Sequence, residues 1–252
     1  MAIPPRNPTT GRSLRGVPQV PTARPAPPRP PARAPRAPAI RRGPGVLRLV
    51  AWPAALTLAV TLLRLVGELR GWSPSYFSRA PGGGLAIVGI AWLVPFVGAW
   101  MGYRLVRAGV RPPGLVELCG WPLGALGVGL LMGYGFERMV QPSWTGTFLL
   151  WSLVSIVVGL VSLVTWPALG VPLVVYAILA RLPVVVIMAF AIFRRWGTHY
   201  DAPPPGFPAL VPMPRWLWTG VLPQSTIWIA LTLGVGMICG AAGVLAASRR
   251  PR

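Results

Sequence analysis

The stretch "LGVPLVVYAILARLPVVVIMAFAIF", residues 169–193, decides the fold class of this chain. It runs for 25 residues with a single charged side chain, Arg181. The hydrocarbon core of a bilayer is about 30 Å thick and needs roughly 20 apolar residues in a helix. Lipid offers no hydrogen bonds to a free backbone group, so a segment of this kind has to be helical throughout its crossing. We therefore predict a transmembrane helix over Leu169–Phe193.

Five further apolar runs reach the same length, and together the six runs predict an all-α polytopic integral membrane helix bundle of about six transmembrane helices. Only 11% of the 252 residues are charged, whereas soluble domains carry about a quarter. The lipid bilayer is thus the first expected partner. Pro167 and Gly170 are expected to form the reversal between the fourth and fifth spans. The predicted spans of the membrane domain, residues 45–248, are 46–66, 84–105, 115–136, 145–166, 169–193 and 225–247.

The first 44 residues differ from the rest of the chain, with thirteen Pro, nine Arg and no acidic residue. Such a segment buries too little apolar surface to offset the entropy of ordering, so we predict a disordered basic tail. Its Arg side chains suit anionic lipid headgroups. Specific nucleic-acid binding is not expected, because no aromatic residue is interleaved among the basic ones. A translation start near Val46 is the alternative explanation of this segment.

Arginine near the ends of the spans predicts the orientation, since cytoplasmic loops collect Lys and Arg. With the amino terminus inside, the inner side holds the tail, the loop with Arg104, Arg107 and Arg111, and the basic end at 249–252. The outer side holds fewer: Arg70, Arg79, Arg138, Arg194, Arg195 and Arg215. We expect a multi-pass protein of the bacterial inner membrane with both termini cytoplasmic.

Arg181 is the most informative ionisable residue, because an Arg at the centre of a helix costs about 2.5–3.5 kcal/mol to insert. It has to face the bundle interior or water. Two kinds of partner are candidates: Glu117 in the third span, and backbone carbonyls released by Pro95 and Pro183. Both a buried structural contact and a substrate or anion contact at mid-membrane are consistent with this position.

A second candidate site follows from the stretch "FRRWGTHYDAPPPG", residues 193–206, which holds the chain's one histidine. In the expected topology Glu68, Glu137, His199 and Asp201 all lie on the outer face. They could form a proton-linked or cation-binding mouth, because His titrates near neutral pH. The interpretation that we favour is simpler: these residues end a helix and anchor it at the headgroups. Glu68 stands four residues after Arg64 and is expected to pair with it.

Small residues recur at four-residue spacing and predict close helix packing. The pairs are Gly98 and Gly102, Gly120 and Gly124, Gly129 and Gly133, and Gly236 and Gly240, with Ser152, Ser155, Gly159 and Ser162 along the fourth span. The ends of the second and fifth spans also align, Pro95 with Pro183 and Gly109 with Gly197, which suggests a three-plus-three inverted repeat.

Enzyme motifs are missing from the sequence: it has no P-loop, dinucleotide fingerprint, nucleophile elbow or HExxH. We therefore expect a non-enzymatic protein without metal or other cofactor. Two functions remain. The first, which we favour from sequence, is a structural or accessory subunit of the cell envelope that packs against membrane-protein partners or its own copies. The second is a small-solute transporter or channel component with Arg181 lining the path, and a cavity reaching Arg181 would favour it.

Overall fold

The computed structural model describes residues 44–84, 86–140 and 143–249. The chain divides into two units at residue 40, and every described residue belongs to the second unit. The predicted disordered tail, 1–44, therefore lies outside the described residues except for Pro44, as does the basic end beyond Arg249.

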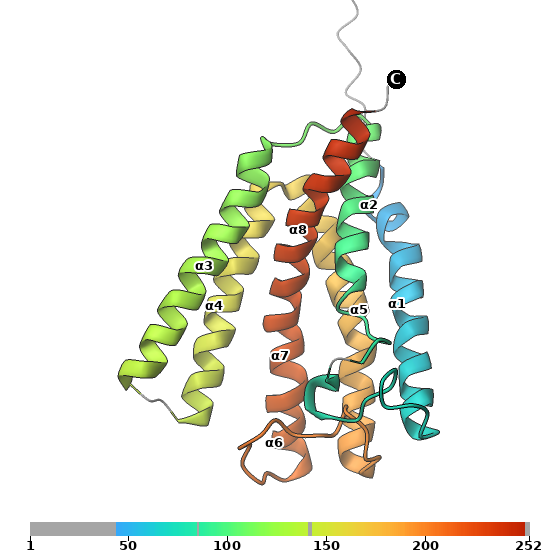
Figure 1. The fold of residues 1–252 in the computed structure, drawn as a ribbon, viewed down its shortest axis with the longest axis vertical. Helices are drawn as coiled ribbons and strands as arrows, with labels where there is room; N and C mark the ends of the chain where they lie inside the picture. The colour runs from blue at the N-terminus through green and yellow to red at the C-terminus, as the bar shows by residue number, and fades with distance from the viewer. Residues whose placement is uncertain (1–43, 85, 141–142, 250–252) are drawn as a thin grey trace, which may run out of the picture. The chain divides into compact units, whose positions relative to one another are not determined.

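All the secondary structure of the described part is helical, which confirms the predicted all-α class. The longer helices cross back and forth between the two ends of the bundle (Figure 1). The elements are α1 (Val46–Leu69), η1 (Pro81–Gly83), α2 (Leu93–Arg107), α3 (Leu115–Val140), α4 (Trp144–Thr165), α5 (Pro167–Arg194), α6 (Pro212–Trp216), η2 (Leu217–Val221), α7 (Leu222–Ser225) and α8 (Ile227–Ser248).

Five helices of the described part are long and apolar enough to cross a membrane: α1, α3, α4, α5 and the continuous helical stretch Pro212–Ser248. The second expected span differs. The prediction of a helix over 84–105 was wrong at its start, because α2 begins only at Leu93 and has 15 residues. At 1.5 Å per residue it is about 22 Å long, less than the thickness of the hydrocarbon core.

Arg64 accounts for the missing turns of this span. Its guanidinium donates hydrogen bonds to the carbonyls of Ser78, Gly83 and Val88, at 3.2, 2.8 and 3.0 Å. Gly83 has a φ of +82°, and a Cβ there would lie 2.4 Å from an Arg64 terminal nitrogen, so the turn needs glycine. The apolar residues before Leu93 thus form an irregular segment wrapped around a cation. Irregular backbone is tolerated at membrane depth where it is buried in protein or lines a cavity.

The last helical stretch begins earlier than the predicted 225–247. It starts at Pro212 and contains a π-helical segment, Leu217–Val221, followed by Pro223. Thr226, with φ −115° and ψ −75°, marks the joint before α8. Interruptions of this kind are frequent where a helix contributes to a functional site.

The reversal between the fourth and fifth predicted spans is where the sequence indicated. Trp166 leaves the helical conformation, and α5 begins at once with Pro167. Gly170 is not in the turn itself but in the first turn of α5, where a Cβ would lie 2.8 Å from Leu163. The missing side chain allows the first turn of α5 to pack directly against the end of α4.

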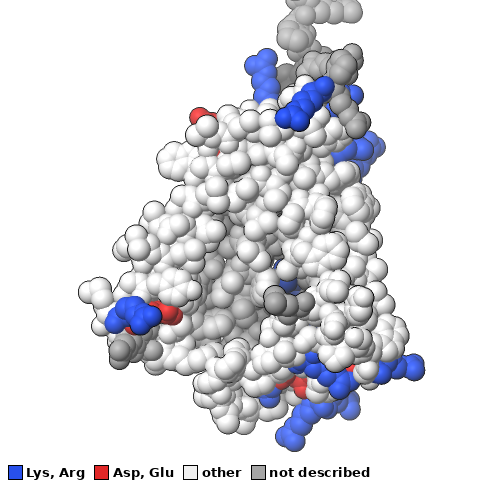
Figure 2. All heavy atoms as spheres, in the orientation of Figure 1, with Lys and Arg blue, Asp and Glu red and all other residues white. Residues whose placement is uncertain are grey.

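The helix directions place both ends of the described unit at the same end of the bundle (Figure 1). This end, upper in the view, has the start of α1, the α2–α3 connection and the end of α8. The opposite end has residues 70–84 and 86–92, the end of α3 with the start of α4, and residues 195–211; we call it the loop end. Charged side chains gather at both ends, and the broad middle is almost entirely uncharged (Figure 2).

Glycine pairs hold α2 against α8, as predicted. A Cβ on Gly98 would lie 2.3 Å from the Gly236 carbonyl oxygen, and one on Gly102 would lie 2.5 Å from that of Gly240. The helices run parallel and in register at backbone contact. Gly129 and Gly133 pack on Val154 and Trp151 of α4.

Gly120 and Gly124 have no atom within 4 Å of a Cβ, so they make no helix contact. The predicted small face of α4 lies toward α8, where a Cβ on Gly159 would lie 3.4 Å from Ala230.

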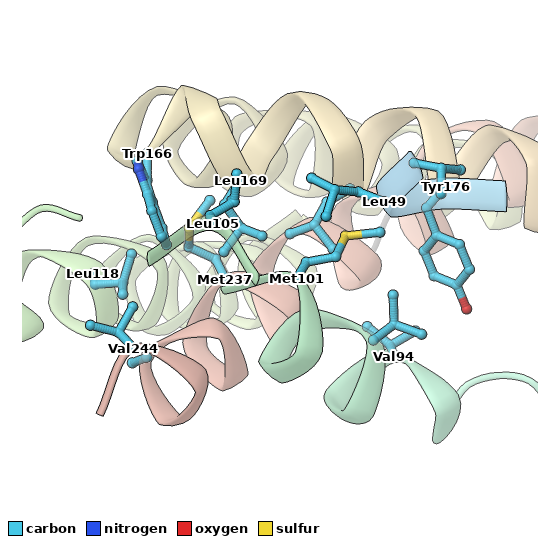
Figure 3. Packing of buried hydrophobic residues seen from close by; sticks show 14 of the residues in the cluster. Leu49, Val94, Met101, Leu105, Leu118, Trp166, Leu169, Tyr176, Met237 and Val244 are labelled. Atoms are coloured by element: carbon cyan, nitrogen blue, oxygen red, sulfur yellow. The ribbon is translucent and has the colours of Figure 1, made fainter. Parts of the chain in front are cut away.

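The apolar core lies where α1, α2, α5 and α8 meet, toward the end away from the loops. Met101 of α2 and Met237 of α8 fill its centre between side chains of α1 and α5 (Figure 3). Leu118 and Trp166 extend this core toward the α3–α4 side. Tyr176 is almost completely buried, with 1% of its surface exposed, and its hydroxyl hydrogen-bonds the Thr57 hydroxyl at 2.9 Å. A second, smaller cluster of buried apolar side chains lies on α5 and the loop after it: Val184, Ile187, Met188, Ala191 and Tyr200.

Candidate functional site

A cavity of about 490 Å³ occupies the bundle between the core and the loop end. Its walls come from α1, the irregular segment before α2, α5, the loop after α5, and the interrupted helix α6–α8. The polar and charged side chains in the lining are Thr61, Arg64, Arg181, His199, Tyr200, Thr219 and Gln224, with Trp92 and Trp228. The lining contains no carboxylate among the described residues.

Arg181 lies at the inner end of this cavity, near the middle of α5. Only 6% of its surface is exposed. The guanidinium lies over the indole of Trp228, with its carbon 4.6 Å from the ring centroid. One terminal nitrogen is 3.4 Å from Gln224 Oε1, near the long limit of a hydrogen bond. The Nε atom has no hydrogen-bond partner.

Neither predicted partner reaches Arg181. Glu117 is exposed at the start of α3, at the end of the bundle away from the loops, where it accepts a hydrogen bond of 3.3 Å from the Gly114 amide. No hydrogen bond of the described residues joins Arg181 to a carbonyl released by Pro95 or Pro183. Pro95 falls in the first turn of α2, where its missing N–H would have had no helical partner in any case.

Arg64 is the second cation of the cavity, and it is compensated. Its Nε donates to Glu68 Oε1 at 2.9 Å, which confirms the predicted i,i+4 pair. Its terminal nitrogens hold the three loop carbonyls described above. The backbone carbonyl of Glu68 also accepts hydrogen bonds from the Arg79 guanidinium. The first connecting loop is thus fastened to the last two turns of α1.

Glu68 and His199 meet at the loop end, which brings together two of the four predicted members of the outer cluster. The carboxylate of Glu68 is fully buried. His199 Nδ1 lies 2.5 Å from Oε1, and the His199 amide donates to Oε2 at 2.9 Å. One buried carboxylate therefore joins the end of α1 to the loop after α5, with Arg64 on its other side.

Burial lowers the pKa of His199 below its ordinary value, and the Arg64 charge acts in the same direction. The hydrogen bond to Glu68 and the charges of Glu68 and Asp201 oppose this and do not overcome it. At neutral pH the imidazole is therefore neutral, and its Nδ1–H is the donor to Glu68. The ring of Tyr200 is buried beside His199, and its hydroxyl donates to the Thr61 carbonyl at 3.3 Å.

The other two members of the cluster have separate roles. Asp201 accepts hydrogen bonds from the Gly197 and Thr198 amides, at 3.0 and 2.7 Å, and so closes the turn after α5. Glu137 accepts a 2.7 Å hydrogen bond from the Trp151 indole within the α3–α4 pair. The turn and helix-end role expected for the stretch 193–206 thus fits Asp201, whereas His199 lines the cavity.

Three features of the site were missed from sequence. Gln224 and Trp228 lie on the last helical stretch, at a spacing of four residues that turns both toward Arg181. The role of Arg64 in holding the loop was also missed. An amide and an indole in an apolar run carry no chemical signal of their own, and only the contact across helices identifies them.

The arrangement offers hydrogen-bond donors and positive charge, not metal ligands. Among the described residues no three His, Cys, Asp or Glu side chains come together to hold a metal ion. The comparisons with protein-family models, with curated proteins and with solved structures find no match to this chain.

Proposed function

We propose that this chain is a multi-pass membrane protein that admits a small solute into its helical bundle, as a transporter or channel component with Arg181 lining the path. The observation that carries the proposal is the cavity of about 490 Å³ that reaches Arg181 from the loop end. Volumes of about 300–1,000 Å³ are typical of small-molecule sites. A purely structural subunit has no need to keep a buried cation beside such a space.

Two features of the backbone support the same function. Interrupted helices and irregular segments at membrane depth are characteristic of transporter sites, where they line water-filled cavities. Here the irregular segment before α2 and the π segment of the last helical stretch both contribute to the cavity wall. We propose further that the loop end faces outward in a bacterial inner membrane, with both termini cytoplasmic.

Cysteine accessibility tests the proposal directly. Val184 is buried on the cavity side of α5, and Ile178 lies on the same helix with 48% of its surface exposed to the surroundings of the bundle. In a background with Cys119 and Cys239 replaced by serine, a charged, membrane-impermeant thiol reagent should label Val184→Cys in membranes. It should not label Ile178→Cys, whose side chain would face lipid.

The exposed loop residue Ser75, changed to cysteine, serves as the positive control for the reagent. Labelling of Ser75→Cys without labelling of Val184→Cys would overturn the proposal, because no aqueous route would then reach the level of Arg181. The accessory-subunit function remains the prediction from sequence, and copurification of a stable membrane partner would support it.

A further inference from the structure

Arg181 is a buried cation without a counter-ion in the described part of the chain. Among the described residues, Arg64 forms an ion pair with Glu68, and the neutral His199 hydrogen-bonds the same carboxylate. Burying a charge without a partner is strongly unfavourable, and Trp228 compensates for it only in part. A mobile anion would complete the site, and the guanidinium Nε, which has no hydrogen-bond partner, is a donor still available to it.

Gln224 supplies a second donor at the same place. Its carbonyl oxygen lies toward Arg181, so its amide nitrogen lies on the other side of the group, where its only partner is the Met188 sulfur at 4.0 Å. A thioether is a weak acceptor. The guanidinium Nε and the Gln224 amide nitrogen are thus two donors on the cavity wall without a strong acceptor. The oxygens of a carboxylate or phosphate are suitable acceptors for them, because charge-assisted hydrogen bonds to such oxygens are short and strong.

The charge of the lining sets the charge of the ligand. Glu68 neutralises the charge of Arg64. Burial lowers the pKa of His199, so its imidazole carries no charge at neutral pH. This leaves one uncompensated positive charge, that of Arg181. A ligand with a single negative charge would balance it, whereas a multiply charged anion would leave negative charge in an apolar space.

The rest of the cavity wall is apolar and sets the character of the remainder of the ligand. Side chains from α4, α5, α7, α8 and the segment before α2 form this part: Ile90, Phe148, Val184, Met188, Pro223 and Trp228. Apolar walls with a few convergent polar groups are the usual form of a site for an amphiphilic small molecule.

We infer that the cavity binds an organic monoanion, with its oxyanion on Arg181 and Gln224 and its apolar part against Trp228, Val184 and Met188. The inference rests on the proposed function, since the ligand has to enter by the cavity. Two kinds of ligand have one oxyanion next to an apolar group: a water-soluble organic carboxylate and an anionic phospholipid.

Binding to the purified full-length chain in a neutral detergent tests the inference. The probes are benzoate and hexanoate, each compared with its uncharged amide, and phosphatidylglycerol compared with phosphatidylcholine in mixed micelles. We expect at least one anionic probe to bind saturably and raise the melting temperature, while its neutral counterpart binds at least tenfold more weakly. Benzoate or hexanoate would identify a soluble source, and phosphatidylglycerol alone would identify a lipid source.

Variants assign the binding to the cavity. Arg181→Gln should weaken binding of the anionic probe by tenfold or more, Arg181→Lys should retain part of it, and Gln224→Leu should weaken it less than Arg181→Gln. Arg48→Gln is the matched control, because it removes the same charge from an exposed position at the opposite end of the bundle. If Arg181→Gln does not fold, the Gln224→Leu and Arg181→Lys variants carry the test.

Equal binding of an acid and its amide, or unchanged binding in these variants, would overturn the inference. So would a failure of every anionic probe to bind. If Val184→Cys is still labelled in that case, the proposed function stands and only the ligand class falls. If Val184→Cys is not labelled, the proposed function falls with it.

Discussion

His199 and Glu68 are 131 residues apart in the sequence, and the imidazole Nδ1 of the first lies 2.5 Å from a carboxylate oxygen of the second. This contact is the link between the two loops that border the cavity. Glu68 also pairs with Arg64, whose guanidinium binds carbonyls of the first connecting loop, so a single carboxylate links the end of α1 to both loops.

Removing this carboxylate should destabilise the protein strongly. Glu68→Gln leaves the buried Arg64 without its counter-ion, and breaking a buried pair in this way costs about 3–5 kcal/mol. The melting temperature in detergent should fall by several degrees. Glu117→Gln is the control, because that carboxylate is exposed at the start of a helix, and it should change the melting temperature little. Equal effects of the two changes would contradict the role given to Glu68.

The stability of the protein should fall as the pH drops below about 6.5, the ordinary pKa of histidine. Burial lowers the pKa of His199 in the folded state, so the unfolded chain takes up a proton first. The loss of stability begins near the pKa that His199 has in the unfolded chain. It levels off at the pH where His199 is protonated in the folded state as well. The His199→Gln variant lacks this pH-dependent contribution. The amount by which the melting temperature of the wild type exceeds that of the variant should therefore shrink as the pH is lowered from 7.5 to 5. A difference that is constant with pH would contradict this.

Alanine at Gly98 should weaken the contact between α2 and α8. Its Cβ would lie 2.3 Å from the Gly236 carbonyl oxygen, and backbone cannot move aside as a side chain can. We expect a loss of about 1–3 kcal/mol, typical of overpacked positions. Gly120→Ala is the matched control, since nothing lies within 4 Å of its Cβ, and it should be neutral or stabilising by up to about 1 kcal/mol. Thermal unfolding of both variants decides whether packing or helix propensity dominates at Gly98.

A reporter at the carboxyl terminus should locate that terminus in the cytoplasm. Within the described residues the two ends of the bundle hold nearly equal numbers of Arg near the spans, five at the end with both termini and six at the loop end. The orientation therefore depends on the basic residues of segment 1–43 and on Arg250 and Arg252. A fused fluorescent protein should be bright and a fused alkaline phosphatase inactive. Periplasmic phosphatase activity would reverse the orientation.

Sequence reasoning succeeded where one physical rule decided the outcome. Hydrocarbon thickness and backbone hydrogen bonding predicted the long helices, and the i,i+4 spacing predicted the Arg64–Glu68 pair. The cost of a charge at mid-membrane singled out Arg181 as facing inward, and it is 94% buried with its side chain in the cavity wall.

Sequence reasoning failed where a residue acts across a long separation. Residues 84–92 are apolar enough for a helix in the sequence, but Arg64, about 20 residues earlier, binds the carbonyls of Gly83 and Val88 in an irregular stretch of backbone. The contacts of Arg181 with Gln224 and Trp228 cross 43 and 47 positions, and no local pattern indicates them. Neither of the two kinds of candidate partner for Arg181 was right: Glu117 lies at the end of the bundle away from the loops, and no hydrogen bond of the described residues joins Arg181 to a carbonyl released by Pro95 or Pro183.

The backbone contact between α2 and α8 has a consequence for motion. Gly98 against Gly236 and Gly102 against Gly240 leave no long side chains that could change rotamer and let one helix slide along the other. The cavity lies beyond this contact, between loops held by a few polar side chains. Any opening or closing of the loop end would therefore swing about the glycine contact as a fixed pivot, with the largest displacement at His199 and the smallest at the opposite face of the membrane.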